Sequence, residues 1–505
     1  MTEGRVVISE TQALLAKEST VLSHSKKWPQ HLAALLASLI SMATGAVAGW
    51  SSPAIPYLQG HMGTEVTNPI TDEQASWVGS IVTLGCLVGA IPAGTLSHKL
   101  GRRGFLLLLA WPLILGWLLI IYGENNVQQI YLGRFINGLS FGAVTVAVPL
   151  YNNEIAEDRV RGSVGVYLDL MLCVGILWSY VVGALSSLYW LSFSCCVIPV
   201  VFLLTFYWMP ESPVHLLAQG KAEDAEMAIR WLRGARPHHQ YDAGPELTKL
   251  QRLVDDAEDR EKAQIKISDL ATFREKLASF SFRSTTTKAV GIAFGLMTFQ
   301  RLSGVSAVVY YTVDIFRGAG TSIAPTTATI IVGVVSVVAS VTSACLVDRL
   351  GRRFLLILSD AVMAVSLAVM AVYFAYKESD VIAMNTMLKA LIPVIALSAH
   401  TFAFRIGLGC VPWFMVPEII PKHAQSWANS LCNFYSYVVL FSVLYSFIWG
   451  VDMFGFGPTF FFFSCTCTIG TVFICFFVPE TKQKSSEQIQ EELENGSKRV
   501  QYRKI

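Results

Sequence analysis

The chain has 505 residues, of which 53% are hydrophobic and only 15% are charged. An ordinary soluble domain carries roughly 25% charged residues, so this shortfall indicates that many side chains face lipid. The net charge of +2 is small and no basic stripe follows a helix face, which argues against a nucleic-acid partner. All ten cysteines lie within apolar runs, so we expect neither a disulfide framework nor a metal site, and no cofactor motif is present.

A polar tail over residues 1–30 precedes a long series of apolar runs. A membrane-spanning helix needs about 20 predominantly apolar residues, and the first run is too long for a signal-peptide core. We expect twelve spans, at 31–51, 75–97, 104–122, 128–151, 163–186, 189–209, 289–316, 325–347, 354–376, 387–416, 426–450 and 456–478.

Lysine and arginine are concentrated in alternate loops between these runs. The stretches 51–76, 123–129 and 450–458 contain neither residue, whereas the loops on the other side contain many. The positive-inside rule then places both termini in the cytosol. The predicted fold is all-α, with 12 transmembrane helices in two six-helix halves and a cytosolic helical layer. The predicted parts are a tail (1–30), a first bundle (31–210), a linker (211–288), a second bundle (289–480) and a second tail (481–505).

The linker is the one large polar insertion and is predicted to form short amphipathic helices. Charges recur on one face of Ala222–Arg233, Pro245–Glu261 and Ile267–Leu277, and Leu, Ile and Trp231 recur on the other. A plain solvated linker would not need an apolar stripe.

A short basic turn occurs twice, once in each half. Its copies run from His98 to Arg103 and from Asp348 to Arg353, each with the sequence Leu-Gly-Arg-Arg between two apolar runs. Such a repeat at half the chain length indicates two similar halves. Acids that follow later spans are expected partners for these arginines, as a cytosolic latch that joins the halves in one state and breaks in another. The alternative is that these charges only anchor helix ends. The expected gate residues are Arg102, Arg103, Glu154, Arg161, Glu211, Asp348, Arg352, Arg353, Glu418 and Glu480.

Further motifs follow in a fixed order and resemble those of one family. They are Gly94-Thr95-Leu96, Gly133-Arg134-Phe135, Pro149 with Tyr151 and Glu154, Pro210-Glu211-Ser212-Pro213, Gln300 with Ser303 and Gly304, Tyr310-Tyr311, Gly407 with Gly409, Pro412-Trp413, and Pro479-Glu480-Thr481-Lys482. Together they resemble the sugar porters of the major facilitator superfamily, in particular the insect facilitated trehalose transporters and the animal facilitative glucose transporters. The resemblance extends from the first span to Lys482, and it implies sugar transport by alternating access.

The chain departs from this family where a sugar would bind. Asp169 stands in place of a glutamine of span five, Arg301 in place of the second of two glutamines of span seven, and Arg405 in place of an acid of span ten. Gln300 and Trp413 are retained. The resemblance implies a substrate site formed by Asp169, Gln300, Arg301, Ser306, Ser336, Arg405, Trp413, Asn433 and Tyr437.

Charges at membrane depth are costly and are functional candidates by default. We predict that Asp169 pairs with Arg301 between spans five and seven, either at the substrate or as a structural ion pair. Proton-coupled members of the family commonly carry an aspartate in span one. The corresponding stretch 44–49 contains no acid, which favours facilitated diffusion.

The sequence therefore predicts a facilitative carrier of trehalose or a hexose, with no enzymatic activity. An alternative is a carrier of an anionic or zwitterionic solute, motivated by Arg301 and Arg405. Another is a non-transporting sugar sensor. The sensor is disfavoured because such sensors tend to have long cytosolic tails, whereas the predicted tails here are 1–30 and 481–505. We expect a monomer in the plasma membrane. Glu10 with Leu14-Leu15 has the spacing of a sorting signal and leaves an endolysosomal membrane open.

Overall fold

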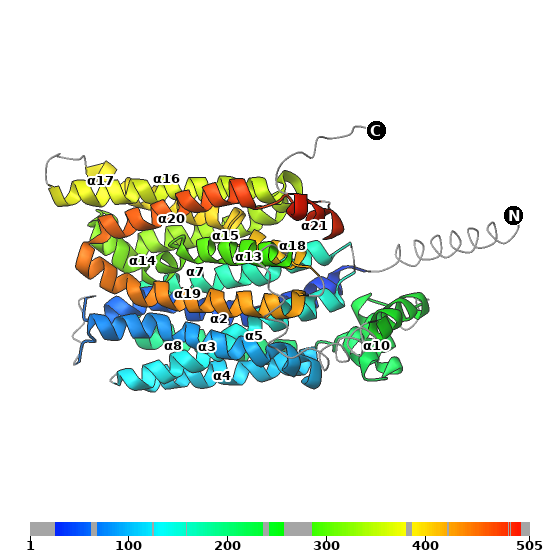
Figure 1. The fold of residues 1–505 in the computed structure, drawn as a ribbon. Coiled ribbons are helices and arrows are strands. Elements are labelled where there is room, and N and C mark those ends of the chain that lie inside the picture. Colours follow the sequence, from blue (N-terminus) through cyan, green and yellow to red (C-terminus); the bar gives the residue numbers. More distant parts are fainter. Residues whose placement is uncertain are drawn as a thin grey trace, which may run out of the picture.

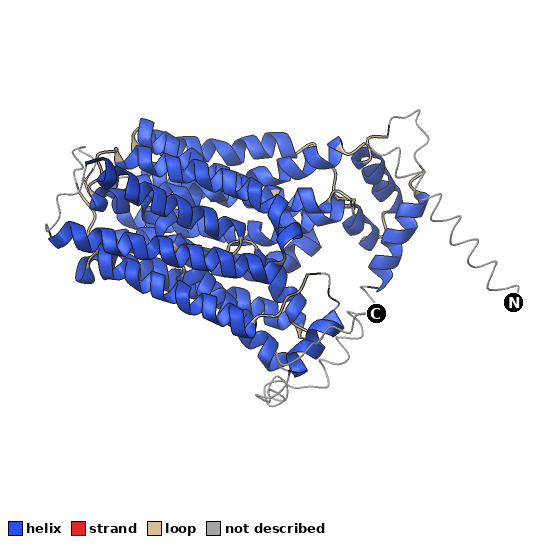
Figure 2. Cartoon of the chain, turned by 90° about the horizontal axis from the view of Figure 1, so that it is seen from above, coloured by secondary structure: helices blue, strands red, loops and turns tan. Residues whose placement is uncertain are grey.

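The structure is a computed structural model that describes residues 26–61, 68–123, 126–157, 159–235, 242–256, 285–379, 386–421, 424–482, 484 and 486–495. In this part of the chain all regular structure is helical, as Figure 2 shows. The helices of the first half are α2 (Trp28–Leu58), α3 (Asp72–Leu100), α4 (Arg102–Tyr122), α5 (Val127–Ile155), α6 (Arg161–Gly165), α7 (Tyr167–Leu185) and α8 (Leu188–Phe206). Those of the second half are α13 (Thr285–Leu302), α14 (Val305–Ala319), α15 (Pro325–Leu350), α16 (Arg352–Ser379), α17 (Thr386–Ile406), α18 (Val411–Ile419), α19 (Gln425–Phe454) and α20 (Phe456–Phe477).

The described residues contain 12 helices long and apolar enough to cross a membrane, which confirms the predicted number of spans. The first span is longer than predicted. The prediction ends it at residue 51, whereas α2 continues through Pro53 and Pro56 to Leu58. A membrane helix tolerates proline because neighbouring helices and serine side chains satisfy the freed backbone groups, and residues 51–56 are all buried here.

Two bundles of helices lie side by side, with their long axes roughly parallel (Figure 1). The helices α10 and α21 (Ser486–Asn495) lie at one end of the bundles, which also carries the two basic turns and is called the basic end below. The opposite end is called the far end. The halves meet along three helix pairs, α3 with α19, α7 with α15, and α2 with α14.

Glycines bring α3 and α5 into backbone contact. A Cβ atom on Gly85 would clash with the Phe135 carbonyl, and one on Gly138 would clash with the Val82 carbonyl. In lipid the helices gain nothing from leaving water, so close van der Waals packing over small residues replaces the hydrophobic effect. This contact makes α3 and α5 a rigid pair within the first half.

Three spans are interrupted. Span five divides into α6 and α7, span seven into α13 and α14, and span ten into α17 and α18. Gly304 separates α13 from α14 with φ of +79°, a conformation that side-chain-bearing residues rarely adopt. Discontinuous helices of this kind expose backbone groups at the centre of transporters, where substrates bind.

The linker forms a helical layer at the basic end, as predicted. It contains α9 (Pro213–Ala218), α10 (Ala222–Leu232) and a helix over 244–256; the third predicted helix lies outside the described residues. Ile229 and Leu232 are fully buried on the apolar stripe, but Trp231 is 37% exposed, contrary to its predicted position. Arg233 holds the layer to the first bundle by an ion pair with Glu157 at 3.0 Å.

Hydrogen bonds and ring contacts join the halves towards the far end. The Val313 amide on α14 donates to the Ser52 hydroxyl on α2 (3.1 Å), and the Tyr180 hydroxyl on α7 donates to the Val309 carbonyl (2.7 Å). Trp77 on α3 packs edge-on against Tyr445 on α19, with ring centroids 5.2 Å apart. These contacts hold the far ends of the two bundles together in this structure.

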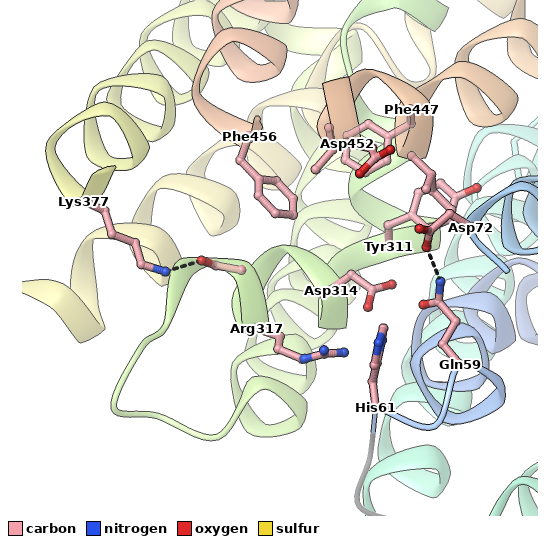
Figure 3. A pocket seen from close by; sticks show the side chains of 13 residues that line it. Gln59, His61, Asp72, Tyr311, Asp314, Arg317, Lys377, Phe447, Asp452 and Phe456 are labelled. Carbon is pink, nitrogen blue, oxygen red and sulfur yellow. Dashed lines mark hydrogen bonds between the residues drawn. The ribbon is translucent and has the colours of Figure 1, made fainter. Parts of the chain in front are cut away.

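A cavity of about 460 Å³ lies at the far end between the halves (Figure 3). Gln59, His61 and Asp72 line it from the first half, and Asp314 and Arg317 are among those that line it from the second. Partial loss of solvent and the nearby Arg317 charge lower the pKa of His61, whereas Asp72 acts in the opposite direction.

The fully buried Tyr311 lines this cavity and marks a close approach of the two halves. A Cβ atom on Gly79 of α3 would overlap the Tyr311 hydroxyl, which donates to the Leu444 carbonyl at 3.0 Å. We expect Gly79→Leu to hold the far ends apart. Spin labels at Gln59→Cys and Asp452→Cys, on opposite walls of the cavity, should then move apart by several ångströms in a pulsed electron-spin distance measurement.

The matched control is Gly104→Leu, because a Cβ atom on Gly104 meets nothing within 4 Å. Its label distance should equal that of the parent protein. An unchanged distance in Gly79→Leu would contradict the role given to this contact.

Candidate functional site

Asp169 and Arg405 form an ion pair between the two halves. Arg405 Nη1 on α17 lies 2.6 Å from Asp169 Oδ1 on α7, and the Ser340 hydroxyl on α15 donates to Asp169 Oδ2 at 2.7 Å. The arginine side chain is 9% exposed and the carboxylate 35%. The predicted pairing of Asp169 with Arg301 is therefore wrong, because Asp169 pairs with Arg405 of span ten.

Arg301 lies elsewhere in the second half, at the last turn of α13. Its Nε donates to the Ser436 hydroxyl on α19 at 2.8 Å. The guanidinium lies over two aromatic rings, 5.8 Å from the centroid of Trp413 and 6.0 Å from that of Tyr437. Cation–π attraction to these rings, strengthened by the low local dielectric, stabilises the buried charge.

Gln300 satisfies the backbone at the interruption of span ten. Its Nε2 donates to the carbonyls of Leu408 (2.8 Å) and Gly409 (3.2 Å), which the break between α17 and α18 leaves without helical partners. Its Oε1 is buried and accepts no hydrogen bond from the described residues. The amide nitrogen of Gln300 thus has a structural role, and the amide oxygen is available to a hydrogen-bond donor.

The other predicted substrate residues divide between these two groups. Ser336 on α15 joins the Asp169 group through Cys173, at 3.5 Å, and the Tyr437 hydroxyl lies 3.3 Å from that of Thr145 on α5. Ser306 is buried at the start of α14, and Asn433 is half-buried on α19 with no side-chain hydrogen bond among the described residues. Sequence reasoning missed Ser340 and Ser436, because a serine in an apolar span carries no signal of its own.

Arg134 is a further buried cation that the prediction treated only as part of a motif. It is fully buried on α5, where it donates to the carbonyls of Val78 (3.2 Å) and Val47 (2.5 Å) and to the Ser51 hydroxyl (2.6 Å). The ring of Trp50 lies 5.2 Å from the guanidinium. Its partners are thus neutral oxygens and an aromatic face rather than a carboxylate.

The first basic turn organises a cluster of charges at the basic end. Glu211 accepts the backbone amides of Arg102 (2.9 Å) and Arg103 (3.0 Å) at the start of α4, where the helix dipole favours an anion. The Arg102 side chain pairs with Glu154 at 3.0 Å. Gly101, with φ of +86°, is needed because a Cβ atom there would lie 2.5 Å from Glu211 Oε2. Burial among these groups lowers the pKa of His215, reinforced by Arg102 and opposed by Glu211 and Glu154.

The second basic turn repeats this arrangement in the second half. Glu480 accepts the backbone amides of Arg352 (3.2 Å) and Arg353 (3.1 Å), and the Arg352 side chain pairs with Glu418. Both clusters therefore close within one half. The latch between the halves stays a prediction, with Arg161 exposed on α6 and the Asp348 side chain outside the described part of the chain.

The described residues contain no group of three or more His, Cys, Asp or Glu side chains that could hold a metal ion. The interface between the two halves, along the helix pairs α3 with α19, α7 with α15 and α2 with α14, is called the seam below; it offers hydrogen-bonding groups, an aromatic surface and charged side chains. Two six-helix bundles that meet in this way are an arrangement typical of membrane transporters.

Comparison with known proteins identifies the family. Residues 22–493 match the family described as "Sugar (and other) transporter", and the chain belongs to that family. It is 34% identical over 473 residues to a facilitated trehalose transporter of Aedes aegypti, covering 94% of this chain and 56% of the relative. It is also 34% identical over 474 residues to that of Polypedilum vanderplanki, covering 94% and 90%. The chain spans about half the length of several of these relatives, including one from Drosophila virilis (50%).

Solved structures share the fold. An inward-open structure of the xylose transporter of E. coli superposes with a TM-score of 0.72 at 20% identity, covering 91% of this chain and 98% of that one. A peptide transporter gives a TM-score of 0.60 at 11% identity, covering 92% and 99%. The predicted two-bundle fold of the major facilitator superfamily is confirmed, and the second likeness shows that this fold alone does not choose a substrate.

The pairing of Asp169 with Arg405 predicts a large coupling between the two side chains. Asp169→Asn and Arg405→Gln each leave a charge without its partner inside the protein. Each should cost about 1–3 kcal/mol, below the 3–5 kcal/mol of a fully buried pair because the carboxylate is partly exposed. Joining both changes, or exchanging the two residues, should recover most of the thermal stability of the purified protein.

The control is the exposed pair Arg230 and Glu226 on α10, at 2.6 Å, whose double-mutant cycle should give almost no coupling. Additive losses in the Asp169 and Arg405 cycle would contradict the ion pair.

Proposed function

We propose that this protein is a facilitative transporter that moves a sugar across a membrane by alternating access. The observation that carries the proposal is the buried Gln300 Oε1, which accepts no hydrogen bond from the described residues. The next residue, Arg301, lies over the ring of Trp413. A sugar hydroxyl can donate to that oxygen, and an aromatic face suits the apolar face of a pyranose ring. Relatives named as facilitated trehalose transporters support the same function, with trehalose or a hexose as the first substrates to test.

The contacts of Arg134 support uniport rather than proton coupling. A proton-coupled carrier needs an acid that is protonated and released during the cycle, and such an acid is well placed beside a buried arginine. Here Arg134 is occupied by carbonyls and a hydroxyl of α2 and α3. Asp169 is likewise occupied, by Arg405 at 2.6 Å and by the Ser340 hydroxyl at 2.7 Å.

The orientation follows from the distribution of charge. The arginines of both basic turns lie at the end of the bundles that also carries α10 and α21, so that end faces the cytosol by the positive-inside rule. The far end then faces the opposite compartment and is the closed end in this arrangement. The plasma membrane is the proposed location, and an endolysosomal membrane is the alternative.

Uptake of labelled trehalose and glucose into proteoliposomes tests this function. We expect saturable uptake of at least one sugar that reaches, but does not exceed, the outside concentration and is unchanged by a pH gradient. Trp413→Ala should raise KM about tenfold because it removes the aromatic platform.

Trp111→Ala is the matched control, because Trp111 is 62% exposed on α4 and lies outside the seam. Accumulation driven by the pH gradient would contradict uniport. A wild-type protein that transports none of these sugars and no related solute would favour a sensor instead.

A further inference from the structure

The charges at the seam do not cancel. Arg405 is matched by Asp169 at 2.6 Å, and Arg134 donates to two backbone carbonyls and to the Ser51 hydroxyl. Among the described residues no carboxylate forms an ion pair with Arg301, whose hydrogen-bond partner is the neutral Ser436 hydroxyl. Arg301 therefore lacks the carboxylate that Arg405 has, and it has fewer oxygen partners among the described residues than Arg134.

An uncompensated charge at membrane depth needs a counter-charge. Burial removes the water that would solvate the guanidinium, and the rings of Trp413 and Tyr437 replace that solvation only in part. A neutral sugar would add hydrogen bonds but no negative charge. A substrate with an anionic group would supply the counter-charge that Arg301 lacks.

The geometry of Arg301 also fits such a group. A guanidinium has five N–H donors in a planar fork, and only the Nε donor is used here, by Ser436. The two terminal nitrogens can hold a carboxylate through two parallel hydrogen bonds. Trp413, 39% exposed and 5.8 Å from the guanidinium, provides the adjacent surface for a sugar ring.

We propose that the substrate is a sugar acid with one carboxylate, which Arg301 binds while Trp413 supports the ring. This inference rests on the proposed function, since it assigns a substrate class to the same site. A group with two negative charges, such as a phosphate, would leave one charge unmatched, because Arg405 is already paired. Uniport of a monocarboxylate moves net charge, so transport should respond to the membrane potential.

The test is uptake of labelled glucuronate and glucose into proteoliposomes of the full chain, with potentials set by potassium and valinomycin. We expect glucuronate to be taken up at least tenfold faster than glucose at equal low concentration, and an inside-positive potential to accelerate only the acid. Arg301→Gln should lower kcat/KM for glucuronate by about tenfold to a hundredfold and leave glucose within about threefold.

Two further variants keep the test decisive. Arg301→Lys retains the charge without the fork, and it should keep the preference for the acid at lower affinity. Arg230→Gln, at an exposed arginine of α10, should leave the preference unchanged. If Arg301→Gln does not fold, competition of glucuronate against glucose uptake in the wild-type protein gives the same answer.

The outcomes separate the two proposals. Glucose or trehalose uptake that glucuronate neither shares nor inhibits would overturn the sugar-acid inference and leave the proposed function standing. Uptake of neither class of sugar would overturn both.

Discussion

The constraint on which the seam depends is that a charge inside a membrane must have a partner. Three arginines of the described spans, Arg134, Arg301 and Arg405, lie away from the two ends of the bundles, and each has different partners. Arg134 is surrounded by backbone carbonyls, Arg405 is paired with an acid of the opposite half, and Arg301 lies on aromatic rings with one hydroxyl. The partners of these arginines determine which parts of the protein are fixed and which can separate. They also determine where a bound substrate can stabilise the protein.

The ion pair of Asp169 and Arg405 has a special position, because its members belong to different bundles. A contact within one half can stay closed throughout a rocking motion, as the clusters around Glu211 and Glu480 can. A contact between halves must rearrange whenever the seam at that point opens. Since an isolated charge at this depth is costly, the pair opposes opening unless water or a substrate replaces the lost partner.

Much of the fold could be predicted from sequence, because twelve apolar runs and a repeated basic turn are strong, local signals. The first span was predicted to end at residue 51, but α2 continues through Pro53 and Pro56 because a buried membrane helix tolerates proline. The site was predicted only as a set of positions. Whether Asp169 would meet Arg301 or Arg405 depends on the helix interruptions and on α15, whose Ser340 completes the aspartate's hydrogen bonds. Such long-range geometry leaves no trace in the spacing of residues along one chain.

The repeated basic turn, in contrast, is a feature whose local structure could be predicted from sequence. The same Gly-Arg-Arg sequence produces the same structure twice, with a glycine at positive φ and a glutamate at the following helix start. Local backbone chemistry decides this arrangement, so sequence alone located it. Its predicted role as a latch between the halves depends on distant geometry and stays a prediction, while the ion pairs of Arg102 with Glu154 and of Arg352 with Glu418 each lie within one bundle.

Counterflow in proteoliposomes tests alternating access most directly. Vesicles loaded with an unlabelled substrate, without ion gradients, should transiently accumulate labelled substrate above its equilibrium level. Each time the protein carries an unlabelled molecule out of the vesicle, its binding site faces the outside again and can bind a labelled molecule. Simple equilibration without an overshoot would show that the protein is not a carrier that exposes one site to each side in turn.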